Sequence, residues 1–173
     1  MSFKLKIGLL LLCLLATSCI SYRNDYGRKR FICCEFTMKR NTNKDVYKII
    51  DTTKIYKRVS VLSINSKDST YLKEFNKTFL KFYADGKVGE FFSYDDISLN
   101  SLNPKKATIG VYKYSKGELT IQTYFRSPQG SGFIKDRLKK HTADFLEFGD
   151  ENYSSRYEKV DIPKEFLIYT PDW

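Results

Sequence analysis

The chain of 173 residues has few cysteines and a single histidine, His141. Its four cysteines, Cys13, Cys19, Cys33 and Cys34, all fall within the first 34 residues. The remainder of the chain therefore has no disulfide framework. The spacing of these residues matches no zinc site, so we expect no metal and no cofactor. Because free cysteine packs as a small hydrophobic residue, we expect that role for the pair Cys33 and Cys34.

Features of a catalytic site are also scarce. The sequence shows no glycine-rich loop that follows a predicted strand and opens a helix, which argues against the common phosphate-binding motifs. His141 lies beside two lysines and is expected to be solvated. The segment 133–148 is expected to form a hairpin that admits two registers. In one of them, Asp136 and Glu147 would both face the interior of the domain. Paired carboxylates can exchange protons or bind a cation. We predict a protein that is not an enzyme, with a small hydrolase as the weaker alternative.

Long hydrophobic runs are missing as well. The apolar run Ile7–Ala16 has ten residues, whereas a helix that crosses a bilayer needs about 20. Lys4 and Lys6 precede the run and small residues follow it, which is typical of a secretory signal. The pattern predicts a signal peptide over residues 1–18.

The end of this run, "LLATSC" at residues 14–19, resembles the lipobox of bacterial lipoproteins. The resemblance implies cleavage before Cys19 and acylation of its sulfur and new amino group. Several acyl chains, at about 0.8 kcal/mol per buried methylene, would anchor the protein durably in membrane lipid. Ile20 follows the cysteine in place of Asp, which by the same resemblance favours the outer membrane, facing the periplasm. An ordinary signal peptide with a coincidental Cys19 is the alternative.

The net charge of +10 is unevenly distributed. Residues 20–44 carry +5, whereas residues 45–173 carry only +3. A nucleic-acid-binding protein more often has a basic face on its folded domain, so we expect no nucleic-acid partner. We interpret residues 19–44 as a lipidated basic tether. A basic segment beside a lipid anchor suits an anionic membrane surface; a solvated linker without specific contacts is the alternative.

Strand signals recur from Val46 onward, because aromatic and β-branched residues alternate between short turn sequences. The pattern predicts an all-β domain over residues 45–173. The expected strands are Ile55–Ile64, Thr78–Ala84, Val88–Tyr94, Thr108–Tyr114, Glu118–Arg126, Phe133–Leu138, Ala143–Phe148 and Tyr153–Lys159.

Two turns predict the register of the neighbouring strands. Asp85-Gly86 suits a two-residue type I′ turn, which would place Lys81 opposite Glu90 and turn the apolar residues Leu80, Phe82, Ala84 and Phe91 inward. The outward face of this hairpin would also be apolar. We therefore expect the tether, a loop or the tail to cover part of it. A two-residue loop at Lys116-Gly117 would place Tyr114 opposite Leu119.

The motifs "FLKFYADGKV", "IGVYKYSKGELTIQ", "GFIKDRLKKHTADFLEF" and "YEKV" together resemble bacterial lipocalin-like domains. The resemblance spans roughly residues 55–160. It implies an eight-stranded antiparallel up-and-down β-barrel, which leaves no sheet edge exposed. The tail "IPKEFLIYTPDW" is expected to pack across the wall or an end of this barrel.

The expected interior admits two interpretations, because an eight-stranded barrel is either filled by its side chains or holds one small ligand. The leading prediction is a lipid-anchored envelope protein that binds a small apolar or amphipathic ligand or serves as a periplasmic interaction module. The alternative is an inhibitor or immunity protein that recognises an envelope protein through the loops "SYDDISLNSLNPKK" and "SPQGSG". The candidate ligand-binding residues are Phe82, Phe91, Tyr112, Tyr114 and Phe125.

Overall fold

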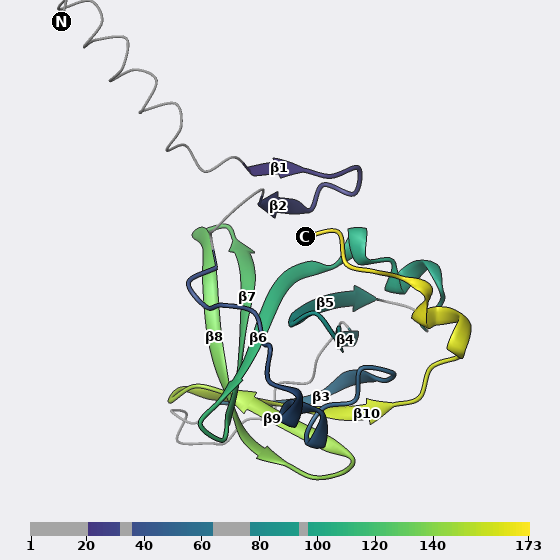
Figure 1. The fold of residues 1–173 in the computed structure, drawn as a ribbon. Coiled ribbons are helices and arrows are strands. Elements are labelled where there is room, and N and C mark those ends of the chain that lie inside the picture. The colour runs from purple at the N-terminus through teal and green to yellow at the C-terminus, as the bar shows by residue number, and fades with distance from the viewer. Residues whose placement is uncertain (1–20, 32–35, 64–76, 94–96) are drawn as a thin grey trace, which may run out of the picture.

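The computed structural model describes residues 21–31, 36–63, 77–93 and 97–173, and its main element is a closed barrel (Figure 1). Eight antiparallel strands follow one another in chain order, and the last pairs with the first. The strands are β3 (Ile55–Ser63), β4 (Lys77–Phe82), β5 (Lys87–Ser93), β6 (Thr108–Ser115), β7 (Glu118–Ser127), β8 (Gly130–His141), β9 (Phe145–Gly149) and β10 (Tyr153–Val160). The predicted eight-stranded up-and-down barrel is confirmed. The predicted leader 1–18, Cys19 and the pair Cys33–Cys34 lie outside the described residues.

The β7–β8 hairpin is longer than the sequence suggested. Ser127 lies opposite Gly130, so only Pro128 and Gln129 form the loop. Most of "SPQGSG", which we expected to be an open recognition loop, therefore belongs to the two strands.

Apolar side chains fill the barrel near the 3-10 helix η1 (Lys44–Lys48), and we call this the η1 end. The rings of Tyr56 and Tyr112 each meet Phe82 edge-on at 5.4 Å between centroids. Val46 of η1 is fully buried against the same cluster. The buried members are Val46, Ile50, Tyr56, Leu80, Phe82, Val88, Tyr112, Leu119, Ile121, Leu146, Phe148 and Tyr157.

The two hairpin predictions have different outcomes. Tyr114 lies opposite Leu119, and Lys116 and Gly117 have positive φ angles of 54° and 81°, so this prediction is confirmed. The type I′ turn at Asp85-Gly86 is wrong, because Tyr83 donates its N–H to the carbonyl of Lys87 and the loop has three residues.

The extra loop residue shifts the predicted register by one, which reverses the faces of one strand relative to the other. Leu80, rather than Lys81, lies opposite Glu90. Leu80 and Phe82 face the interior as expected, whereas Phe91 faces outward and Ala84 is exposed in the turn. After the two-residue turn, a three-residue loop with glycine in the left-handed conformation is among the most common connections of a hairpin.

The apolar outer face of β3–β6 is covered, as the sequence predicted. The 3-10 helices η2 (Asn100–Leu102), η3 (Pro104–Lys106) and η4 (Lys164–Ile168) lie over it together with the tail, which confirms that the tail packs across the barrel wall (Figure 1). The buried residues of this second cluster are Ile55, Phe79, Phe91, Leu102 and Ala107, and Ile97, Val160, Ile162, Phe166 and Trp173 pack against them.

The basic segment before the barrel is not a solvated linker where the structure describes it. Residues Ser21–Arg23 (β1) and Lys29–Phe31 (β2) form a hairpin at one end of the barrel, which we call the β1–β2 end (Figure 1). The ring of Phe31 meets that of Tyr124 at 5.3 Å. Further along, the backbone N–H of Tyr114 donates to the side chain of Asn41 at 2.9 Å. The alternative of a solvated linker without specific contacts is therefore wrong for the described parts of residues 20–44.

We predict that Gly86→Ala destabilises the protein more than Gly117→Ala. Both glycines have φ near +80°, where a side chain costs about 1–2 kcal/mol. A Cβ at Gly86 would also lie 2.5 Å from the backbone nitrogen of Asn41, whereas nothing lies within 4 Å of one at Gly117. Urea unfolding should show an additional cost of about 1 kcal/mol or more for Gly86→Ala. Equal costs would mean that the segment around Asn41 does not pack against this turn.

Candidate functional site

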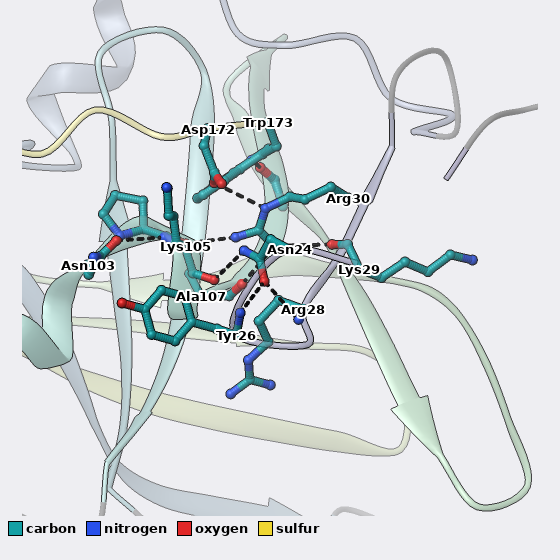
Figure 2. Close-up of polar contacts among 12 residues, drawn as sticks. Asn24, Tyr26, Arg28, Lys29, Arg30, Asn103, Lys105, Ala107, Asp172 and Trp173 are labelled. Carbon is teal, nitrogen blue, oxygen red and sulfur yellow. Dashed lines mark hydrogen bonds and ion pairs between the residues drawn. The ribbon is translucent and has the colours of Figure 1, made fainter. Parts of the chain in front are cut away.

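The buried guanidinium of Arg30 fixes the β1–β2 hairpin to the barrel (Figure 2). Its Nη2 donates to the carbonyl of Pro104 at 2.9 Å, and its Nη1 donates to that of Ala107 at 3.2 Å. Its Nε pairs with Asp172 Oδ1 at 3.1 Å, and its Cζ lies 5.3 Å from the ring of Trp173. Burial lowers the pKa of Arg30 and the carboxylate of Asp172 opposes this shift. One side chain thus joins the hairpin, the η3 segment and the tail.

Asn24 makes a second set of contacts at the turn of the hairpin (Figure 2). Its amide nitrogen donates to the carbonyl of Lys105 at 2.6 Å. Its side-chain oxygen accepts from the backbone N–H groups of Tyr26 at 3.1 Å and Arg28 at 3.0 Å. Such Asx turns fix the backbone of a short loop. The turn of the hairpin is therefore held against η3 independently of Arg30.

A cleft of about 280 Å³ lies between this hairpin and the ends of β5, β6 and β7. Its size lies near the lower limit for small-molecule sites. The lining combines cations with aromatic rings, because strand ends of the barrel meet a basic hairpin. The cations are Arg23, Arg28, Lys29 and Arg126, and the rings are those of Phe92, Tyr124 and Phe125, with Glu90 among the other residues.

Several of these cations lie over the rings of their neighbours. Lys29 Nζ is 4.8 Å from the ring centre of Phe31 and 5.5 Å from that of Tyr124. Arg28 Cζ is 6.0 Å from the ring centre of Phe92. These are cation–π distances, which hold a positive charge beside an apolar surface. The cleft can therefore receive a ligand with an apolar body and an anionic group.

The five predicted ligand-binding residues do not form one site. Phe82 and Tyr112 belong to the filled core, and Tyr114 packs against it. Phe91 lies under the tail on the outside of the barrel, so its predicted interior position is wrong. Phe125 is 38% exposed and is the one member of the five that lines the cleft.

The cations of the cleft were not among the predicted site residues. Arg23, Arg28 and Lys29 contributed only to the net charge of the supposed tether. The sequence does contain a signal for this hairpin. Asn24-Asp25-Tyr26-Gly27 is a turn sequence, and it lies between two short alternating segments. It would have placed the basic residues on a folded element.

A polar cluster occupies the barrel interior near the cleft. Arg58 Nη2 donates to Thr78 Oγ1 at 2.9 Å, and its Nη1 lies 3.9 Å from Glu90 Oε1. Tyr157 is 5% exposed, and burial raises its pKa. Glu90 belongs both to this cluster and to the lining of the cleft. The interior therefore changes from apolar at the η1 end to charged beneath the cleft.

The carboxylate pair considered for a hydrolase is not formed. Asp136 lies opposite the core residue Ile121, so it faces inward, and it accepts a hydrogen bond of 2.8 Å from the hydroxyl of Tyr153. Burial raises the pKa of Asp136. Glu147 lies between the core residues Leu146 and Phe148 and therefore faces outward. The two carboxylates are on opposite faces of the sheet.

The described residues contain no group of three or more His, Cys, Asp and Glu side chains arranged to hold a metal ion. His141 is exposed. Within the same residues, no helix has the length and apolar character needed to cross a membrane.

Comparisons of the chain with protein-family models, with curated proteins and with solved structures find no match.

We predict that Asp172→Asn destabilises the protein by about 2 kcal/mol, because it leaves the buried charge of Arg30 without its carboxylate. This value is below the full cost of breaking a buried pair, since the Asp172 side chain is 26% exposed. The matched control is Asp161→Asn, which removes a pair to Lys54 from a carboxylate that is 85% exposed. Urea unfolding should show less than about 0.5 kcal/mol for this control. Equal losses would contradict a central role for Arg30.

Proposed function

We propose that the protein is a lipid-anchored envelope protein that binds a small amphipathic molecule in the cleft beside the β1–β2 hairpin. The observation that carries this proposal is the lining of the cleft, where cations and aromatic rings face the same space of about 280 Å³. An amphipathic anion would place its apolar part on Phe92 and Phe125 and its charged part near Arg23, Arg28 and Arg126. Aromatic side chains combined with polar groups that fix the orientation of a ligand are typical of ligand recognition.

The binding site is proposed at the rim rather than deep in the barrel. Tyr56, Phe82 and Tyr112 pack ring against ring in the η1 end, which leaves these side chains as core. Glu90 reaches from the cleft to Arg58 inside the barrel. A basic or hydroxyl group of the ligand could therefore exchange partners with this pair.

The anchor is proposed at Cys19, on the sequence of the leader. The protein would then reside in the outer membrane and face the periplasm. Acyl chains on Cys19 would hold the cleft close to membrane lipid, because β1 begins only two residues later. This position supports a ligand of the kind found in or near membranes.

The test of the anchor is the mass of the mature protein purified from its own cells. We expect cleavage before Cys19 and an added mass of acyl chains, together with incorporation of labelled palmitate. Cys19→Ala should abolish both the cleavage and the label. Cys13→Ala is the control, because Cys13 would be removed with the leader, and this variant should keep both. An unmodified Cys19 in the wild-type protein would refute the anchor.

The test of the ligand is native mass spectrometry of the protein extracted from its own envelope in mild detergent. We expect a bound small molecule, and about tenfold weaker retention in the double variant Phe92→Ala/Phe125→Ala, since tenfold corresponds to about 1.4 kcal/mol of lost apolar contact. Val59→Ala/Ile168→Ala is the control, because it shortens two exposed apolar side chains elsewhere. Retention unaffected by the first variant would exclude the cleft. A bound protein in place of a small molecule would favour the inhibitor or immunity-protein alternative.

A further inference from the structure

The cleft belongs to a larger surface that surrounds the β1–β2 hairpin. A second cleft of about 370 Å³ shares Arg23, Lys29 and Arg126 with the first. A third, of about 350 Å³, shares Arg28 and Phe92 with it. Because neighbouring clefts share residues, the three form one continuous surface. We call this surface, with the hairpin that divides it, the hairpin face.

Exposed apolar rings gather on the hairpin face. The described residues include seven exposed large hydrophobic side chains, and four of them line these clefts. They are Tyr22 at 48%, Tyr26 at 47%, Phe92 at 44% and Phe125 at 38% exposure. Aromatic rings with one apolar and one wet side are typical of membrane–water interfaces.

Positive charge gathers on the same face. Five cations line the clefts, namely Arg23, Arg28, Lys29, Lys106 and Arg126, against the single acidic residue Glu90. Glu90 lies beside Arg58, which offsets its charge. Lys106 Nζ also lies 5.3 Å from the ring centre of Tyr26. Cations and rings are thus interleaved rather than separated.

The hairpin face is preformed. Arg30 and Asn24 hold the hairpin to the η3 segment through side-chain hydrogen bonds to backbone carbonyls, and Arg30 also pairs with the carboxylate of Asp172 in the tail (Figure 2). The exposed residues of the hairpin are therefore presented on a fixed element. Little conformational entropy is lost when such a surface binds its partner.

We propose that the hairpin face docks on the anionic surface of the membrane in which the protein is anchored. This inference rests on the proposed anchor at Cys19. One residue, Ile20, separates Cys19 from Ser21 at the start of β1, so the hairpin begins at most about 7 Å from the lipidated residue. That distance is shorter than the Debye length of about 8 Å at physiological ionic strength. Cations near the start of β1 are therefore only partly screened from the lipid headgroups.

The test uses the mature chain, purified from its own cells and reconstituted into vesicles of phosphatidylcholine alone or with phosphatidylglycerol. Hydrogen–deuterium exchange is measured for the hairpin 21–31 and for the turn 115–118 at the opposite end of the barrel. We expect exchange in the hairpin to slow about tenfold or more on anionic vesicles, because each cation near such a surface strengthens binding by about fivefold. The turn should be unaffected. Protection of the hairpin should disappear at 1 M KCl, where the Debye length is about 3 Å.

Charge reversal provides the matched comparison. Arg23→Glu/Lys106→Glu/Arg126→Glu should abolish the protection. Lys113→Glu/Lys116→Glu/Lys140→Glu has the same change in net charge on exposed residues near the η1 end and should keep it. Equal exchange of the hairpin on both kinds of vesicle would overturn the proposal.

The same samples separate failure of docking from failure of the anchor. Flotation of the vesicles reports the anchor, since a lipidated chain floats with neutral vesicles as well as with anionic ones. A chain that floats with both but shows no protection would retain the anchor and refute docking. A chain that fails to float with neutral vesicles would refute the anchor.

Discussion

Burial of the Arg30 guanidinium is the interaction on which the β1–β2 end of the molecule depends. A charged group that is 1% exposed is costly unless its donors are satisfied and its charge is paired. The structure meets this condition with backbone carbonyls of Pro104 and Ala107 and with the carboxylate of Asp172. These partners come from separate parts of the chain, so one side chain joins the hairpin to both η3 and the tail. The cleft exists because this junction holds the hairpin beside the strand ends.

The barrel interior is apolar at the η1 end and charged beneath the cleft. At the η1 end, aromatic and aliphatic side chains pack as an ordinary core. Beneath the cleft, the interior carries Arg58 and Glu90, and such buried charge pairs add little to stability. Polar groups in such positions are candidates for a functional site. The proposed ligand site and the proposed membrane contact both lie at the β1–β2 end, near the predicted anchor.

Local patterns predicted the barrel well and the site poorly. Alternation and turn sequences located all eight strands, and the alternation of faces on both sides of Lys116-Gly117 fixed the register of that hairpin. Asp85-Gly86 failed because the same dipeptide also suits a three-residue loop, and packing of the Asn41 segment selects between the two. The contacts of Arg30 with Asp172 join residues 142 positions apart. Such a contact leaves no periodic trace in the sequence, so the basic segment resembled a linker.

The most direct test of this account is the side-chain Nε–H of Arg30, observed by NMR in the purified full-length chain and assigned with an Arg30→Lys variant. A guanidinium bonded to Asp172 and covered by Trp173 should exchange this proton with water at least about 100-fold more slowly than an exposed arginine. Exchange at the rate of an exposed arginine would show that the hairpin is a free tether, and the cleft and the hairpin face would be lost with it.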